Sequence, residues 1–262
     1  MMNKLVFTND NDTSIILIDH TYTKTFRTRF EHEAIFRKII SYLIKNKLII
    51  GNIVDSGAWI GDNAIPWAKQ IGGLVYAIDP SLDNLNFIVQ LSNKNCINNV
   101  VTIQNALSDI VEDLYTDDSL DHCMFTSNNT KKIKVISTTL DTLYFSSIID
   151  NIGFIHLDVE SFEFKALVGA STLLEKFNPI VAFEQHLELD NYKGLVAYLS
   201  CRGYKVFLID EILKGCRPDC RNFLAIPEYS RVDINDINIH IGYTALIESF
   251  CDEDVRFFGE YD

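Results

Sequence analysis

Two short apolar runs end in acidic residues, and two glycines follow the first run. Acidic side chains and glycines at such positions can hold a nucleoside. The run 52–55 ends in an acid, and Gly57 and Gly61 separate it from a segment of helical spacing. Glycines let the backbone approach a ligand closely, and a helix start offers unpaired N–H groups. A second run, 73–79, ends in Asp79, about twenty residues after the turn, where a carboxylate can accept both hydroxyls of a ribose. These residues predict a nucleoside cofactor.

The glycine spacing alone is a weak signal. It is Gly-x-x-x-Gly, not the Gly-x-Gly-x-x-Gly of dinucleotide sites, and glycine turns between a strand and a helix are common. A purely structural turn is therefore the alternative. Asp55 at the tip of the first run and Asp79 after the second favour the cofactor.

Further groups that could do chemistry also end apolar runs. Ligands of open parallel sheets bind outside the carboxyl ends of the strands, so one crevice could hold them all. The groups at predicted strand ends are Asp55, Asp79, Asp158, Glu184 and His186.

The elements that position these groups alternate between strand and helix. Apolar residues at helical spacing indicate helices over 31–46, 62–71, 82–94, 163–177 and 192–202. Apolar runs indicate strands over 52–55, 74–79, 98–105, 151–158, 179–184, 204–209 and 222–227. The polar interval 108–134 is predicted to be a hairpin or loop, with 135–140 as its return strand. This alternation favours an α/β fold with a mostly parallel sheet whose last two strands form an antiparallel edge pair.

We expect one core with two attachments. Residues 51–227 form the core, 228–262 form a tail without an assigned structure, and 1–50 form an extension. The extension is expected to be a small β-hairpin region, with a turn at 9–12, followed by the helix. It covers an edge of the core or, alternatively, closes over the pocket as a lid. In the lid hypothesis His20, Tyr22, Arg27 and Arg29 lie near the substrate.

Composition limits the function classes. The 262 residues carry a formal charge of −13 and a sequence pI of about 4.8, which disfavours a nucleic-acid partner. The apolar runs are too short to span a bilayer, so no membrane association is expected. Six irregularly spaced cysteines suggest a reduced, cytoplasmic protein. A homo-oligomer is compatible with the sequence.

We predict no metal site. Cys216-Arg-Pro-Asp-Cys220 has metal-like proximity, but no second pair or histidine lies nearby in the sequence, and zinc needs four ligands. Two ordinary thiols in a loop are preferred. Asp158, Glu160 and Glu184 offer oxygen ligands for a divalent cation, an alternative that the sequence does not favour.

Five ordered motifs between about residue 50 and residue 227 resemble the FkbM family of methyltransferases. They are Val54-Asp-Ser-Gly-Ala-Trp-Ile-Gly61, Ala77-Ile-Asp-Pro80, Asn105-Ala-Leu-Ser-Asp109, Thr139-Leu-Asp141 and Ile155-His-Leu-Asp-Val-Glu-Ser-Phe-Glu163. The resemblance implies a Rossmann-like class I methyltransferase fold with a seven-stranded sheet. It also implies transfer of a methyl group from S-adenosylmethionine to a hydroxyl of a sugar, glycan or other small molecule.

The resemblance also implies roles for single residues. Asp55, Gly57, Ala58 and Gly61 would lie at the methionine end of the cofactor, Asp79 at the ribose, and Asn105 with Ala106 beside the adenine. Asp158 and Glu160 match the acidic pair of the family. Three positions depart from the family's usual residues: Trp59 replaces Asn, His156 replaces Lys, and Ser161 replaces Gly.

Methyl transfer to a hydroxyl needs a base within hydrogen-bond reach of the acceptor. Asp158 is the first candidate, with Glu160 second; their alternatives are a turn cap and a surface carboxylate. His186 follows a strand and has a pKa range suited to a base, unless it only bonds a loop carbonyl. His156 lies inside a strand and is expected to be a packed core residue or a partner of a site residue.

Two other function classes stay open at this point. One is a non-catalytic S-adenosylmethionine-binding or partner-binding protein that has lost the base, which the departures at His156 and Ser161 would allow. The other is an RNA cap methyltransferase, against which the acidic balance and the lack of an aromatic and basic stripe count.

Overall fold

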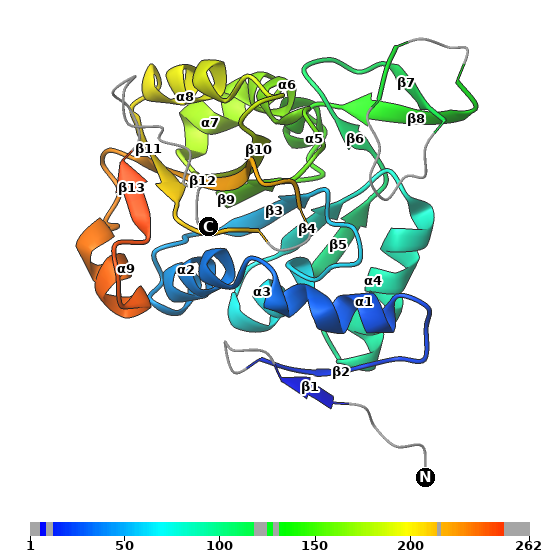
Figure 1. Cartoon of the computed structure of the whole chain (residues 1–262). Helices are drawn as coiled ribbons and strands as arrows, with labels where there is room; N and C mark the ends of the chain where they lie inside the picture. The colour runs from blue at the N-terminus through cyan, green and yellow to red at the C-terminus, as the bar shows by residue number, and fades with distance from the viewer. Residues whose placement is uncertain (1–5, 9–12, 118–124, 128–130, 214–215, 249–262) are drawn as a thin grey trace.

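A computed structural model of the chain describes residues 6–8, 13–117, 125–127, 131–213 and 216–248. Its centre is an eight-stranded sheet with the order β13-β11-β12-β10-β9-β3-β4-β5 (Figure 1). The five strands from β10 to β5 run parallel, whereas β12 is antiparallel to both of its neighbours. The strands are β3 (Asn52–Ser56), β4 (Val75–Ile78), β5 (Val100–Ile103), β9 (Ile152–Leu157), β10 (Ile180–His186), β11 (Tyr204–Ile209), β12 (Cys220–Pro227) and β13 (Leu246–Glu248).

Helices cover both faces of this sheet, and two apolar cores result. Successive strand residues point to opposite faces, so Ile53 joins one core and Val54 the other. One face carries α2 (Ala34–Lys45), α3 (Ala64–Gln70), α4 (Leu82–Lys94) and α9 (Ile234–Ile241), and the other carries α5 (Leu140–Phe145), α6 (Glu163–Val168), α7 (Ser171–Phe177) and α8 (Tyr192–Ser200). None of the described helices is both long and apolar enough to cross a bilayer.

The predicted α/β class is confirmed, but the sheet has eight strands instead of seven. The extra strand is β13 in the tail, which pairs antiparallel with β11. The last two core strands, β11 and β12, are antiparallel as expected. They are not an edge pair, because β12 lies between β10 and β11, and β13 covers the outer side of β11.

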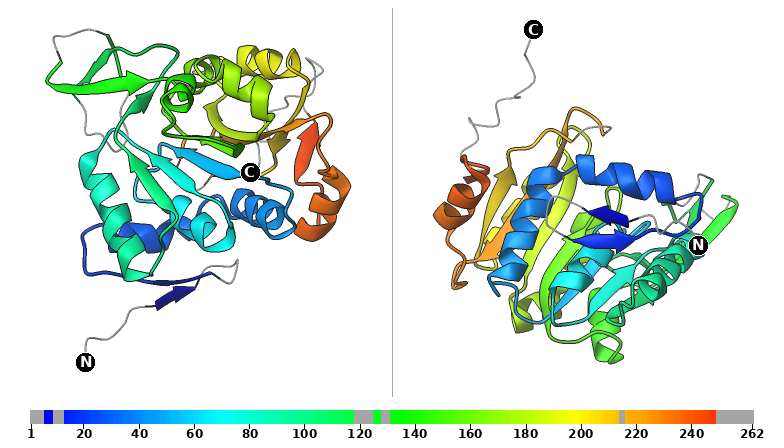
Figure 2. Two further views of the ribbon diagram at one scale, coloured as in Figure 1. Left: turned by 180° about the vertical axis from the view of Figure 1, so that it is seen from behind. Right: turned by 90° about the horizontal axis from the view of Figure 1, so that it is seen from below.

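The N-terminal extension differs from the hairpin region that the sequence suggested. Strands β1 (Val6–Thr8) and β2 (Ser14–Ile16) do form an antiparallel pair. The segment after them is helical, as α1 (Thr23–Thr28) and a short 3₁₀ helix, η1 (Arg29–Glu31). Phe26 of α1 is buried against Phe87 of α4, with ring centroids 6.2 Å apart. Strands β1 and β2 and helix α1 thus lie along the outside of the α3 and α4 layer (Figure 2); the predicted turn at 9–12 falls outside the described residues.

Two other predicted elements are divided. The helix expected over 163–177 is divided into α6 and α7 at Gly169 and Ala170. The backbone of Ser108 lies against this break, and a Cβ at Gly169 would stand 2.3 Å from the Ser108 carbonyl oxygen. The strand expected over 98–105 ends at Ile103. A second, three-stranded sheet follows, made of β6 (Ala106–Leu107), β7 (Asp113–Thr116) and β8 (Ile133–Thr138). Within the predicted polar interval, 118–124 and 128–130 lie outside the described residues.

A buried ionic network attaches the extension to the core. Arg37 of α2 contacts the Asp62 carboxylate at 2.7 Å and the Glu33 carboxylate at 3.2 Å, and Arg29 contacts both acids at 3.2 Å. Asn222 of β12 donates to the other Glu33 oxygen at 2.9 Å. Burial alone would raise the pKa of Glu33 and of Asp62, but the two arginines outweigh it and lower both pKa values. Both acids are therefore ionised.

Replacing Arg37 by alanine is expected to lower the free energy of unfolding by about 3–5 kcal/mol, because two buried carboxylates lose a cation. The matched control is Arg27→Ala, which removes an exposed arginine from α1 and should change it by less than about 0.5 kcal/mol. Urea unfolding measures both. Equal effects of the two substitutions would contradict the assignment.

Candidate functional site

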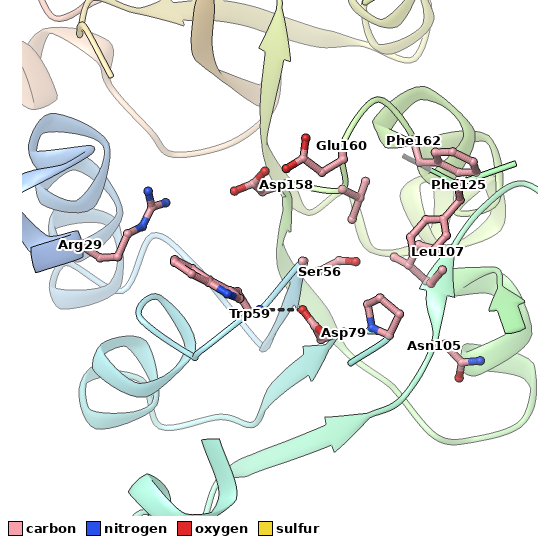
Figure 3. A pocket seen from close by; sticks show the side chains of 14 residues that line it. Arg29, Ser56, Trp59, Asp79, Asn105, Leu107, Phe125, Asp158, Glu160 and Phe162 are labelled. Atoms are coloured by element: carbon pink, nitrogen blue, oxygen red, sulfur yellow. Dashed lines mark hydrogen bonds between the residues drawn. The ribbon is translucent and has the colours of Figure 1, made fainter. Parts of the chain in front are cut away.

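A pocket opens at the carboxyl ends of the central parallel strands (Figure 3). About 660 Å³ of space lies between its walls, and part of this space is open to solvent. The walls come from the segments after β3, β4, β5 and β9 and from η1. The lining residues are Arg29, Ser56, Gly57, Trp59, Asp79, Pro80, Asn105, Ala106, Leu107, Phe125, Asp158, Val159, Glu160 and Phe162.

Gly57 brings the first loop against the fourth parallel strand. Its φ is +72°, and a Cβ there would lie 1.7 Å from the Asp158 carbonyl oxygen. The Asp158 N–H in turn donates to the Ser56 carbonyl at 3.0 Å. In the sheet, β3 lies between β4, the next strand along the chain, and β9. The order of the strands therefore reverses at β3, and ligands of such sheets bind at this point.

Asp79 shapes the loop that faces it. One carboxylate oxygen accepts from the Trp59 N–H at 2.8 Å, and the other accepts from the Ser81 N–H at 2.8 Å and the Asn84 amide at 3.2 Å. The carboxylate lies at the pocket wall with its orientation set by these bonds (Figure 3).

Three of the predicted cofactor residues lie behind the pocket wall. Asp55 is fully buried, and its carboxylate is 2.8 Å from Nδ1 of His156, its neighbour across the β3–β9 pairing. Ala58 and Gly61 are also buried and do not line the pocket. Asp55 is two residues after Ile53 on β3, so both side chains point to the face of the sheet that α2 and α3 cover. Gly57, Asp79, Asn105 and Ala106 do line the pocket.

His156 is a packed core residue, as expected. Its ring stacks on Phe36, with centroids 5.1 Å apart, and meets Trp67 edge-on at 5.5 Å. Burial disfavours the charged ring, yet the hydrogen bond and charge of Asp55 outweigh this and raise the pKa of His156. Burial also raises the pKa of Asp55. The hydrogen bond between the two groups joins β3 to β9 beneath the pocket.

Asp158 and Glu160 both lie in the pocket, at the end of β9 (Figure 3). Burial, with the negative charges of Glu33 and Glu160 nearby, raises the pKa of Asp158 to about 6. Glu163 fixes their loop by accepting from the Val159 N–H at 2.9 Å. The pocket therefore holds a carboxyl group that changes its protonation near neutral pH.

The third candidate base is elsewhere. His186 does not line the pocket, and Glu184 does not either; both lie beside Cys216 and Cys220. Among the described residues, Asp158, Glu160 and Glu184 are not grouped as ligands of one cation. Glu184 is instead grouped with His186, Cys216 and Cys220.

One of the four lid candidates reaches the pocket. Arg29 lines it, with its guanidinium carbon 5.4 Å from the centre of the Trp59 ring. His20 and Tyr22 instead pack on Phe87, with centroids 4.8 and 5.6 Å apart, and Arg27 is exposed. The extension thus contributes a cation to the pocket wall.

The sequence did not predict which residues form the apolar wall of the pocket. Leu107, Phe125 and Phe162 line the side opposite Arg29, and the two phenylalanine rings meet edge-on at 6.3 Å (Figure 3). Phe125 comes from the polar interval between β7 and β8, where no periodicity marks it. Phe162 follows Glu160 by two residues, and this proximity to the acidic pair was the one available signal.

The sequence model of the methyltransferase FkbM domain matches residues 55–206, which include the pocket segments after β3, β4, β5 and β9. This chain belongs to the FkbM methyltransferase family. No match exists among functionally curated proteins.

Solved structures of methyltransferases are also among those to which this FkbM family member is similar. The FkbM methyltransferase of Methylobacillus flagellatus is 19% identical, with a TM-score of 0.48, over 66% of this chain and 43% of that one. The chain thus spans less than half of that relative. A putative methyltransferase of Streptococcus mutans in complex with SAH is 12% identical, with a TM-score of 0.45, over 71% and 94% of the chains. A putative O-methyltransferase of Klebsiella pneumoniae is 7% identical, with a TM-score of 0.47, over 73% and 80%.

Two departures from the usual FkbM residues occupy left-handed backbone. Trp59 has a φ of 41°, and Ser161 has a φ of 72°. The family's usual residues there, Asn and Gly, are the two that tolerate this conformation best. Trp59 and Ser161 are therefore held in a conformation that costs them more than it would cost asparagine or glycine.

Ser161→Gly is expected to raise the free energy of unfolding by about 1 kcal/mol, because glycine adopts a positive φ without steric cost. Ser200→Gly, at the exposed last residue of helix α8, is the control and should change it by less than about 0.5 kcal/mol. Thermal unfolding of both variants measures the difference. Destabilisation by both would show that Ser161 is not strained.

Proposed function

We propose that this protein is an S-adenosylmethionine-dependent O-methyltransferase whose acceptor is a hydroxyl of a sugar, a glycan or another small molecule. The observation that carries the proposal is that Asp158 shares one pocket with Asp79 and the Gly57 turn. A group suited to remove a proton thereby lies next to a cradle suited to a nucleoside.

The pocket fits the cofactor in three places. Asp79 would accept from the ribose hydroxyls, and Asn105 with Ala106 would lie along the adenine, where Leu107 and the phenylalanines offer apolar surface. The absence of a side chain at Gly57 leaves the backbone free to approach the methionine end. Asp55 and Gly61 support this loop from behind. When bound, S-adenosylmethionine supplies an electrophilic methyl group.

Asp158 is the proposed general base. With a pKa of about 6 it is ionised at neutral pH yet still basic enough to take a proton from a hydroxyl as the bond forms. Glu160 would accept from a neighbouring hydroxyl of the acceptor and so orient it. Arg29 keeps a positive charge facing Asp158, which favours the ionised form of the base.

The part of the pocket lined by Asp158 and Glu160 suits a small, hydroxyl-rich acceptor better than a nucleic acid. Asp158 and Glu160 would repel phosphates, and Arg29 is already engaged with Glu33 and Asp62. The non-catalytic alternative requires a pocket without a base, whereas Asp158 supplies one with a suitable pKa.

Asp79→Asn is expected to weaken binding of S-adenosylhomocysteine about 10- to 100-fold, because a charged acceptor for the ribose is lost and the amide disturbs the bond to Trp59. Asp83→Asn changes an exposed carboxylate on α4 and should leave the affinity unchanged. Isothermal titration calorimetry compares the two. An unaltered affinity of Asp79→Asn would remove the ribose assignment.

The rate of methyl transfer should rise with pH through about 6, because Asp158 acts only when deprotonated. Asp158→Asn should lower kcat/KM about 10²- to 10⁴-fold and abolish this pH step, while S-adenosylhomocysteine still binds. The measurement is transfer of a labelled methyl group to a panel of sugars and small polyols. A variant that keeps the wild-type pH profile would refute the base assignment.

A further inference from the structure

Four side chains of metal-binding type meet outside the pocket. One ligand atom each from Glu184, His186, Cys216 and Cys220 lies within 4.8 Å of all the others. A tetrahedral zinc site with these atom types has ligand–ligand distances of about 3.3–3.8 Å, calculated from the usual bond lengths. A small inward movement of the side chains would therefore complete such a site.

The sheet itself creates this arrangement. Glu184 and His186 are two residues apart on β10 and point to the same face. His186 lies directly opposite Cys220 in the antiparallel pairing of β10 with β12, so their side chains are neighbours. Cys220 also contacts the Glu184 carboxylate, and Cys216 lies 3.4 Å from the same carboxylate oxygen.

The turn that carries the two thiols is held in place. The Cys220 N–H donates to the Arg217 carbonyl at 3.0 Å, which closes the turn. Asp219 anchors the turn to the end of β10 by accepting from the Leu187 N–H at 3.0 Å and the Glu188 N–H at 3.1 Å. The turn is therefore held against the end of β10 by contacts that involve neither thiol.

One buried atom of the group also lacks a partner. Nδ1 of His186 is buried and has no hydrogen-bond partner among the described residues. A cation bound among these four side chains would give this ring nitrogen a partner.

We propose that Glu184, His186, Cys216 and Cys220 bind one Zn²⁺ ion. Two thiolates, an imidazole and a carboxylate are ligands that zinc accepts, and thiolates select against Mg²⁺ and Ca²⁺. Four protein ligands leave no open position, so the ion has a structural role. It joins the turn 216–220 to β10 and β12, on the face where Asn222 binds Glu33 of the ionic network. The proposal does not depend on methyl transfer.

The test uses the full-length protein, reduced, stripped with a chelator, dialysed and then given ZnCl₂. Metal analysis after removal of excess zinc should find one Zn²⁺ per chain, and zinc should raise the melting temperature. Cys220→Ser and Glu184→Gln should weaken zinc binding roughly tenfold or more. Cys201→Ser, which removes an exposed free thiol on another part of the chain, is the matched control and should bind like wild type.

Cobalt identifies the ligands without reference to activity. Co²⁺ should give thiolate-to-metal charge-transfer absorption and the intense visible bands of a tetrahedral site, and both should be lost in Cys220→Ser. A wild-type protein that retains no zinc, or one in which Cys220→Ser and Cys201→Ser retain it equally, would overturn the proposal. A Cys216–Cys220 disulfide that persists in reductant with no bound metal would do so too.

Discussion

The close contact between Gly57 and the backbone of Asp158 is the constraint on which the rest of the site depends. Because a Cβ at position 57 would collide with the Asp158 carbonyl, only glycine lets the loops after β3 and β9 meet. This contact places the proposed nucleoside cradle and the acidic pair in one pocket. The Asp55–His156 pair directly beneath it joins the same two strands through their side chains. The geometry of the site is therefore set mainly by backbone packing at the centre of the sheet.

Much of this architecture could be predicted from periodicity. Helix α4 has the predicted bounds, and the parallel strands lie within one or two residues of theirs, because apolar runs there are buried on both faces. The errors arose where local pattern and tertiary context conflict. Residues 22–26 alternate like a strand, yet Phe26 is buried in a helix against Phe87. Apolar periodicity continues through 163–177, yet the helix is divided at Gly169 and Ala170, where glycine lets the Ser108 backbone approach.

The sequence predicted a pocket residue correctly where the position of the backbone is sufficient to place it. It failed where the direction of the side chain determines whether the residue lines the pocket. Asp79 and Asp158 follow strand ends and line the pocket, whereas Asp55 belongs to the opposite face of β3 and is buried. The spacing of residues along the chain also gave no indication of the group formed by Glu184, His186, Cys216 and Cys220. Cys216 and Cys220 have no histidine near them in the sequence, but the antiparallel pairing of β12 with β10 brings His186 opposite Cys220. Such pairings depend on strand order, which a single sequence specifies only weakly.

The most direct test of the account is a crystal structure of the protein with bound S-adenosylhomocysteine. The account predicts the ribose at Asp79, the adenine along Asn105–Leu107, and the sulfur facing the Asp158 carboxylate across the Gly57 turn. A ligand bound elsewhere, or one whose sulfur points away from Asp158, would contradict it.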